Sequence, residues 1–456
     1  MADRYATVRD MTEGKPMKLL LGFSLPLLFG NLFQQFYTLV DTMIVGRFLG
    51  KYALAGVGST GSVNFLIIGF CMGVCGGFAI PIAQRFGAKD YAGLRRFVAN
   101  AVWLSAGLAV VLTAVVGVSC RQILTVMKTP ADVFDYAYTY ILVIFLGIPV
   151  TIFYNLLASM IRALGDSRHP VLFLVTASFV NIGLDLLFIL VFHMGVFGAA
   201  LATVISQGVS GVCCLVYILR SMEVLRFKPR ETRPDRHFMH TLLAMGLPMG
   251  LQYSITAIGA VILQTAVNGL GSDSVAAVTA AGRVSMFLSC PYDAMGQTMS
   301  TWGGQHVGAK KLERVNAGLR DCILLGSIYS IIAFFVVFLF GRSLAALFLG
   351  AGEVAVLDRA HRYLMINSAF YIPLALVNII RFLIQGIGFP TFAILAGVCE
   401  MFARILVALA LVPALGFFGV CFANPCAWIA ADLFLIPAYR YEIRKLKRLF
   451  SAETRT

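Results

Sequence analysis

The chain has 456 residues, of which 59% are hydrophobic, and its 36 basic and 22 acidic residues give a net charge of +14. Only 13% of the residues are charged, whereas about 25% is usual for water-soluble domains. The mean hydropathy of +0.85 points the same way. This composition excludes a water-soluble protein and predicts an all-α integral membrane protein.

Twelve apolar runs are long enough to cross the bilayer, which takes about 20 residues per helix. In the first half we predict spans at residues 17–46, 53–80, 97–119, 136–164, 170–192 and 195–219. In the second half we predict spans at residues 241–267, 275–304, 319–340, 363–387, 389–413 and 416–439. The predicted domains are an N-terminal lobe at 1–219, a basic linker at 220–240, and a C-terminal lobe with its tail at 241–456.

The basic residues lie mainly on one side of these spans. With an even number of spans both termini share a side, and 26 basic residues fall on that side against 7 on the other. Arg283, Arg381 and Arg404 lie within spans. The positive-inside rule therefore predicts that both termini, the linker and the tail are cytoplasmic. Because topology accounts for the charge, we expect no nucleic-acid partner.

The two halves of the chain resemble each other. QRFGAKD at Gln84–Asp90 returns as QHVGAKK at Gln305–Lys311, a shift of 221 positions. Similar shifts relate Gly50 to Gly271, Gly195 to Gly416, Pro26 to Pro248 and Asn155 to Asn378. Because each half contains six helices, the repeats enter the membrane in the same orientation. We therefore predict two six-helix lobes around a V-shaped central cleft that works by alternating access.

Five acidic residues fall inside predicted spans and away from the span ends, namely Asp41, Asp185, Asp293, Glu400 and Asp432. Each costs at least about 2.5–3.5 kcal/mol at mid-bilayer, so each needs a partner, a water-filled cavity or a proton.

Three polar stripes mark the first lobe. They are formed by Gln34, Tyr37 and Asp41, by Ser178, Asn181 and Asp185, and by Thr203, Ser206, Gln207 and Ser210. Because lipid offers no hydrogen bonds, these stripes must face each other or water. Two carboxylates placed together disfavour each other's ionisation, which makes a site for a proton or a small cation. The alternative is that neighbouring hydroxyl groups satisfy both carboxylates and only fix helix packing.

In the second lobe, Glu400 and Arg404 are four residues apart, the favourable order for an ion pair on one helix, and Arg381 could join them. A structural ion pair and a substrate site are both open readings of this group. For Arg283, Asp293 and Asp432 we expect mainly structural or helix-end roles. The residues that we expect to line a substrate cavity are Gln34, Tyr37, Phe153, Asn155, Tyr253, Arg283, Met286, Asn378 and Glu400.

Three stretches together resemble a known family: SLPLLFGNLFQQFYTLVDTMIVGRFLGKYALAGVG at Ser24–Gly58, NIGLDLLFI at Asn181–Ile189 and GVFGAALATVISQ at Gly195–Gln207. They are similar to the MATE family of multidrug and toxic compound extrusion transporters. The resemblance implies antiport of organic, often cationic compounds against Na⁺ or H⁺. It also implies a cation site at Asp41, Asn181, Asp185 and Thr203, where Na⁺ bound by Asp41 and Asp185 would be the only metal.

The second lobe departs from some branches of that family, which carry acids on helices seven and ten. Here the predicted span 241–267 has no acid and the span 363–387 carries Arg381. We expect a monomeric, secondary active multidrug efflux antiporter of the bacterial cytoplasmic membrane, with small organic substrates, the lipid bilayer as its surroundings and no cofactor besides the coupling ion. No nucleophile or cofactor motif indicates an enzyme. The alternative is a flippase for a lipid-linked precursor, which would need a strongly cationic cavity.

Overall fold

The computed structural model describes residues 10–227, 231–349 and 354–453, and every regular element within these ranges is helical. The predicted all-α fold is confirmed for this part of the chain. Two compact units are present, one formed mainly by Phe29–Gly250 and the other by Met11–Leu28 together with the chain from Leu251 onward. The predicted lobes and linker also include residues 1–9, 228–230, 350–353 and 454–456, which lie outside the described residues.

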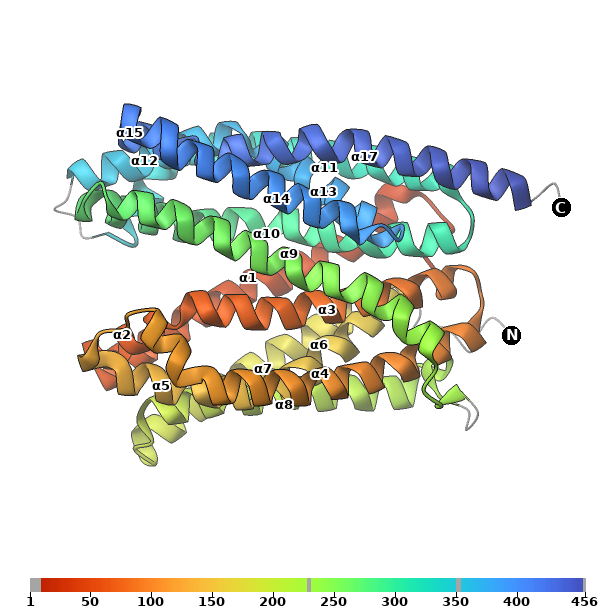
Figure 1. The fold of residues 1–456 in the computed structure, drawn as a ribbon, viewed down its shortest axis with the longest axis horizontal. Helices are drawn as coiled ribbons and strands as arrows, with labels where there is room; N and C mark the ends of the chain where they lie inside the picture. The colour runs from red at the N-terminus through yellow and green to blue at the C-terminus, as the bar shows by residue number, and fades with distance from the viewer. Residues whose placement is uncertain (1–9, 228–230, 350–353, 454–456) are drawn as a thin grey trace. The chain divides into compact units, whose positions relative to one another are not determined.

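Figure 1 shows the helices in chain order. The first unit contains the second part of α1 (Pro16–Leu49), α2 (Lys51–Ser59), α3 (Gly61–Gly87), α4 (Tyr91–Val126), α5 (Ala131–Leu146), α6 (Ile148–Ala163), α7 (Arg168–Leu186), the π-helical turn η2 (Leu187–Val191), α8 (Gly195–Ser221), the 3-10 turn η3 (Glu223–Leu225) and the first part of α9 (Arg236–Asn268). The second unit contains the remainder of α1 and α9, then α10 (Ser272–Gly308), α11 (Leu312–Ala346), α12 (Val354–Ala369), α13 (Tyr371–Gly386), α14 (Pro390–Leu406), the π-helical turn η5 (Val407–Leu411), α15 (Val412–Leu415), α16 (Phe417–Cys421) and α17 (Ala423–Glu453).

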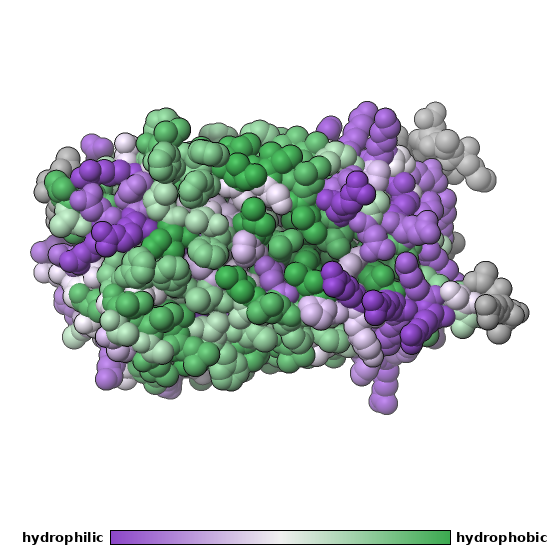
Figure 2. Space-filling view, turned by 90° about the horizontal axis from the view of Figure 1, so that it is seen from above, coloured by the Kyte–Doolittle hydropathy of each residue, from purple (hydrophilic) through white to green (hydrophobic). Residues whose placement is uncertain are grey.

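Within the described residues, nine helices are long and apolar enough to cross a membrane, and two bent helix pairs bring the number to eleven. The one predicted span that does not pass this test is 275–304. It corresponds to α10, which carries Asp273, Arg283 and Asp293 and is therefore less apolar. On the face shown in Figure 2, apolar side chains form a broad band along the helices, and hydrophilic side chains gather beyond its ends. This pattern is typical of a multi-pass membrane protein.

The backbone reproduces the internal repeat. The pair α5 and α6 is bent by 48°, and its counterpart α12 and α13 is bent by 54°. The π-helical turns η2 and η5 end equivalent helices. Positive φ angles recur at Gly50 and Gly271, at Lys89 and Lys310, and at Gly195 and Gly416. The repeat predicted from short sequence matches is thus confirmed by equivalent bends and turns.

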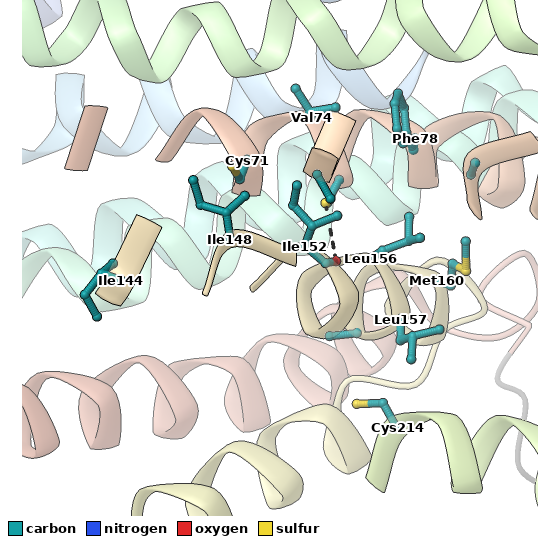
Figure 3. Packing of buried hydrophobic residues seen from close by; sticks show 14 of the residues in the cluster. Cys71, Val74, Phe78, Ile144, Ile148, Ile152, Leu156, Leu157, Met160 and Cys214 are labelled. Carbon is teal, nitrogen blue, oxygen red and sulfur yellow. Dashed lines mark hydrogen bonds between the residues drawn. The ribbon is translucent and has the colours of Figure 1, made fainter. Parts of the chain in front are cut away.

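Apolar side chains of α3 and α6 form the core of the first unit (Figure 3). Cys71, Val74 and Phe78 on α3 are buried, as are Ile148 and Ile152 on α6. The Sγ of Cys75 donates to the carbonyl oxygen of Ile152 at 3.8 Å. Because lipid is as apolar as these side chains, close packing stabilises the bundle more than removal from water does.

The tightest helix crossing in the first unit joins α3 to the first part of α9. Glycines spaced by four residues meet there, Gly73 and Gly77 on α3 with Gly246 and Gly250 on α9. A Cβ atom on Gly77 would lie 2.5 Å from the Cα of Gly246, and one on Gly73 would lie 2.8 Å from the Cα of Gly250. Small residues at this spacing allow two helix backbones to approach closely within lipid.

The helices that open the two repeats change unit at equivalent points. In α1 the division falls between Leu28 and Phe29, and in α9 it falls between Gly250 and Leu251. Pro26 and Pro248 lie two residues before these divisions. A proline removes one backbone hydrogen bond and weakens the helix locally. Each opening helix is therefore weakest close to where it passes from one unit into the other.

A short strap before α1, residues 11–14, is held by the second unit. The amide of Met11 donates to Oε1 of Gln305 at 3.0 Å, and Nζ of Lys311 donates to the carbonyl oxygen of Thr12 at 3.1 Å. Arg314 donates to the carbonyl oxygen of Gly14 at 2.7 Å. The repeated motif at Gln305–Lys311 thus supplies two of the three groups that bind this strap.

The equivalent strap before α9, residues 231–235, is held by α4 of the first unit. Arg95 binds both carboxylate oxygens of Glu231, at 2.6 and 2.9 Å. Trp103 donates to the carbonyl oxygen of Thr232 at 3.0 Å, and the amide of Asp235 donates to Oδ1 of Asn100 at 2.8 Å. The polar linker is therefore anchored, so its end nearest α9 has a defined structure.

The glycine crossing predicts a stability effect. Gly77→Ala should lower the thermal unfolding midpoint, because its Cβ meets helix backbone that cannot rotate away, with a cost of about 1–3 kcal/mol. The matched control is Gly117→Ala on α4, where a Cβ meets no atom within 4 Å. Differential scanning fluorimetry of purified protein measures both variants, and an equal midpoint for Gly77→Ala and wild type would contradict the crossing.

Candidate functional site

Two carboxyl groups from different helices meet in the first unit. Asp41 lies on α1 and Asp185 on α7, and their side chains are within hydrogen-bonding reach of each other. Asp185 is fully buried, and within the described residues no donor reaches either of its oxygens or Oδ1 of Asp41. Because ionised carboxylates can only accept hydrogen bonds, this pair needs a shared proton or a cation.

Asn181 extends the polar surface of α7 by one turn. It is fully buried, and within the described residues neither its amide nitrogen nor its amide oxygen has a partner. Ser178, one turn earlier, donates to the carbonyl oxygen of Leu174 at 2.9 Å and is therefore satisfied within its own helix. The unsatisfied groups of α7 are thus concentrated at Asn181 and Asp185.

A tyrosine connects this part of α1 to α8. The side chains of Tyr37 and Thr203 lie close to each other. The hydroxyl of Thr203 donates to the carbonyl oxygen of Ala199 at 3.1 Å. Tyr140 on α5 lies within electrostatic range of Asp41 and Asp185. Sequence analysis missed Tyr140 because it is one of three tyrosines within residues 136–140 and nothing in the sequence distinguishes it from the other two.

The remaining polar residues of α8 are satisfied by nearby groups. Ser206 bonds to the carbonyl oxygen of Ala202, and Ser210 bonds to that of Phe173 at 3.2 Å. The Oε1 of Gln207 accepts from Thr151 at 2.6 Å. The polar groups in this part of the stripe therefore stabilise helix packing. Thr203, in contrast, lies near Tyr37 on the helix that carries Asp41.

The predicted substrate residues of the first unit occupy different surroundings. Gln34 is exposed on α1, and Tyr37 is half-buried. Asn155 donates to the carbonyl oxygen of Thr151 at 2.9 Å, and the ring of Phe153 lies against Gly211 of α8. Their roles toward a substrate stay predictions.

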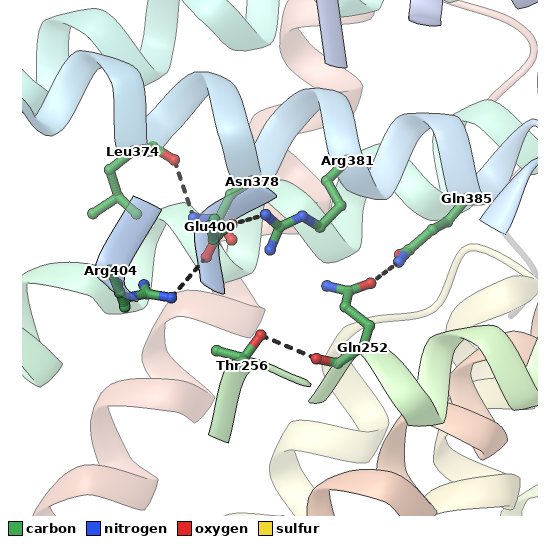
Figure 4. A network of polar contacts seen from close by, with 8 residues as sticks. All are labelled: Gln252, Thr256, Leu374, Asn378, Arg381, Gln385, Glu400 and Arg404. Atoms are coloured by element: carbon green, nitrogen blue, oxygen red, sulfur yellow. Dashed lines mark hydrogen bonds and ion pairs between the residues drawn. The ribbon is translucent and has the colours of Figure 1, made fainter. Parts of the chain in front are cut away.

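A buried ionic network lies between α13 and α14 of the second unit (Figure 4). Glu400 accepts from Arg381 through one oxygen and from Arg404 at 3.3 Å through the other. All three side chains are more than nine-tenths buried. The pair of Glu400 with Arg404 that the four-residue spacing predicts is confirmed, and Arg381 joins it. The carboxylate of Glu400 is therefore fully engaged by two cations.

Two glutamines lie beside this network, as Figure 4 shows. The amide of Gln385 on α13 donates to Oε1 of Gln252 on α9, and both side chains are buried. Thr256 donates to the carbonyl oxygen of Gln252 at 3.0 Å, and Asn378 donates to that of Leu374 at 3.1 Å. The glutamines were missed in sequence because neither is charged and they are 133 positions apart.

The other predicted residues of the second unit are more scattered. Arg283 and Met286 are exposed on α10, and Tyr253 is half-buried on α9 within electrostatic range of Arg381. Within the described residues, Arg283 and Asp293 form no ion pair with each other. Asp432 on α17 is buried, lies within electrostatic range of Arg381, and has one carboxylate oxygen without a partner.

One polar cluster of the first unit was not predicted. Asp166, between α6 and α7, accepts from the ring of His169 at 2.6 Å and from the hydroxyl of Tyr217 on α8 at 2.7 Å. The rings of His169 and Tyr217 are stacked, with centroids 4.1 Å apart. The three residues lie 51 positions apart at their widest, so no single motif in the sequence joins them. This cluster joins the start of α7 to α8.

An internal repeat that buries polar and charged groups within apolar helices is typical of secondary transporters. A family model described as MatE matches residues 26–187 and 248–410, so the chain belongs to the MatE family, a family of transporters. The two matched segments begin at Pro26 and Pro248, the equivalent prolines of the two repeats.

The chain is similar to two Bacillus subtilis (strain 168) proteins, both 28% identical to it. "Probable multidrug resistance protein YoeA" matches over 94% of each chain, and "Probable multidrug resistance protein YpnP" over 83% of each. A solved structure described as "Reverse polarity of binding pocket suggests different function of a MOP superfamily transporter from Pyrococcus furiosus Vc1 (DSM3638)" is 25% identical to the chain. Its TM-score is 0.88, covering 96% of this chain and 98% of that one.

The network around Glu400 predicts a large stability loss on removing its charge. Glu400→Gln should destabilise the protein by about 3–5 kcal/mol, because two buried guanidinium groups lose their shared carboxylate. The thermal midpoint of purified protein measures this. Glu313→Gln, an exposed acid on α11, is the matched control and should leave the midpoint unchanged. Equal midpoints for Glu400→Gln and Glu313→Gln would contradict a buried network.

Proposed function

We propose that the protein is a secondary active multidrug efflux antiporter, which exports cationic or amphipathic organic compounds in exchange for H⁺ or Na⁺. Membership of the MatE family and the multidrug-resistance names of its relatives support the transport of such compounds. The observation that carries the coupling is the contact of Asp41 with Asp185, because no described donor or cation neutralises it.

In the proposed cycle the pair binds the coupling ion in one state of the transporter and loses it in the other. Ion binding removes the repulsion between the two carboxylates, and Asn181 and Thr203 complete the site with neutral oxygens. Asp41 and Tyr37 share α1 with Pro26, so a change at the carboxyl pair can repack a helix that is weakened at that proline. The ion drives export only if the two states differ in affinity for ion and drug.

A membrane voltage would add to this driving force. Moving one charge across the membrane supplies about 2.3 kcal/mol per 100 mV. The identity of the ion follows from which gradient drives export, since both a proton and Na⁺ suit a carboxylate pair with amide and hydroxyl neighbours.

The flippase alternative has weaker support. A lipid-linked pyrophosphate would need several cations free to bind it, whereas Arg381 and Arg404 both bind Glu400. Arg283, on α10, is a further arginine within a predicted span. Drug export is therefore the function that the charges favour.

The coupling proposal predicts that Asp41→Asn abolishes gradient-driven export. Pump-deficient bacteria that express wild type should extrude a fluorescent organic cation under an imposed pH or Na⁺ gradient. Asp41→Asn should lower the initial rate at least about tenfold, which corresponds to an increase of ~1.4 kcal/mol or more in the activation free energy of transport. Asp132→Asn, an exposed acid at the start of α5, is the control and should behave as wild type. Full export by Asp41→Asn would contradict the proposal.

We also propose that the protein lies in the bacterial cytoplasmic membrane with both termini in the cytoplasm, because 26 basic residues lie on that side and 7 on the other. In a variant without native cysteines, Lys51→Cys and Lys128→Cys should react with an impermeant maleimide in intact cells. Arg236→Cys should react only after permeabilisation. The reverse pattern of labelling would overturn this orientation.

A further inference from the structure

The outward face of α17 continues without interruption from lipid-facing residues to basic residues. Leu433, Pro437, Tyr441, Arg444 and Arg448 are all exposed, and their spacings of four, four, three and four place them on one side of the helix. Figure 1 shows that α17 is the last helix before the C-terminus. Arg444 and Arg448 therefore lie on the same side of the helix as Leu433. We expect the exposed side chain of Leu433 to contact the acyl chains of the lipids.

The opposite face of the same segment is fixed against the second unit. Tyr439, Ile443 and Leu446 are buried. The hydroxyl of Tyr439 donates to Asn316 of α11 at 2.7 Å. Lys445 lies over the ring of Phe389, with Nζ 5.2 Å from the centroid. These contacts prevent rotation of the helix end, so the direction of its arginines is set by packing.

The length of α17 puts these residues at the membrane surface. Its 31 residues extend about 46 Å, whereas the hydrocarbon core is about 30 Å thick. About ten residues at one end must therefore lie among the headgroups or beyond them. Tyr441, with 63% of its surface exposed, is of the residue type that favours the boundary between hydrocarbon and headgroups. Arg444 and Arg448 follow Tyr441 by one and two turns.

The cations on this face have no acidic partner among the residues that the structure describes. Within the described residues, Arg440, Arg444, Lys447 and Arg448 form no ion pair, although they are exposed and spaced three or four residues apart. Other arginines are paired, such as Arg95 with Glu231 at 2.6 Å and Arg342 with Asp358 at 3.2 Å. Like charges at these spacings destabilise a helix, so this face needs counter-charge from outside the protein.

We propose that this face of α17, defined by Arg440, Tyr441, Arg444, Lys447 and Arg448, is a docking site for anionic phospholipid headgroups. Charge complementarity and depth select the partner, because the length of α17 brings Arg444 and Arg448 to the level expected for the phosphates of the leaflet. Arginine also binds phosphate through two parallel hydrogen bonds. Topology alone explains why basic residues gather on one side of the membrane, but it does not require them to be unpaired and turned toward lipid.

The test compares lipid retention in variants that lose equal charge. One variant carries Arg444→Gln, Lys447→Gln and Arg448→Gln, and the control carries Arg47→Gln, Arg121→Gln and Lys128→Gln, which are also exposed. Each full-length protein is incubated in vesicles of equimolar phosphatidylcholine and phosphatidylglycerol, extracted, and examined by native mass spectrometry. Retention of phosphatidylglycerol by the α17 variant should fall roughly tenfold to hundredfold, since each charge near the surface contributes about one factor of five.

A second measurement separates loss of lipid from loss of folding. The thermal midpoint of wild type and control should rise when phosphatidylglycerol replaces phosphatidylcholine, whereas the α17 variant should keep one midpoint in both lipids. Soluble glycerol phosphate should not reproduce the rise, because it is not held at the depth of Tyr441. Equal retention and an equal rise in midpoint for the α17 variant and the control would overturn the proposal. A rise produced by glycerol phosphate alone would overturn its assignment to lipid. This proposal does not depend on the coupling ion, so loss of drug export would leave it intact.

Discussion

The lack of hydrogen-bonding partners in hydrocarbon is the constraint on which the rest of this structure depends. Each buried carboxylate must find its partners within the protein or bind an ion. In the second unit, Glu400 is satisfied by two arginines. In the first unit, no donor among the described residues reaches Asp185, which lies beside the carboxyl group of Asp41. The same constraint thus produces a buried ion-pair network in one unit and a carboxyl pair that requires a proton or cation in the other.

The repeat is symmetric in backbone and asymmetric in charge. Equivalent bends, π-helical turns and positive φ angles occur in both halves. The acid on α7 at Asp185 has Leu406 as its counterpart at a shift of 221, and Glu400 corresponds to Phe179. The scaffold of the two halves is shared, whereas the buried charges differ between them. This difference is the basis for proposing that the first lobe, and not the second, binds the coupling ion.

Much of the fold could be predicted because hydrophobic length and the positions of glycine and proline are local signals. The twelve spans, the repeat and the pair of Glu400 with Arg404 depend on spacing within a helix or on short motifs. The contact of Asp41 with Asp185, in contrast, depends on how α1 and α7 rotate against each other. The polar stripes predicted that these helices face each other or water, but they did not determine this contact. Tyr140, the bond between Gln252 and Gln385, and the glycine crossing of α3 with α9 depend on contacts between distant helices. No period in the sequence reports such contacts.

The measurement that tests the central claim most directly is ion release on drug binding by the purified protein. Isothermal calorimetry measures the binding of a fluorescent organic cation to the protein. Titrations in buffers of different ionisation enthalpy report how many protons leave, and titrations with and without Na⁺ report whether Na⁺ leaves. We expect wild type to release about one ion per drug molecule bound and Asp185→Asn to release none. The coupling free energy between ion and drug should be about 1–3 kcal/mol, which is usual for linked sites. A drug affinity independent of both pH and Na⁺ in wild type would contradict it.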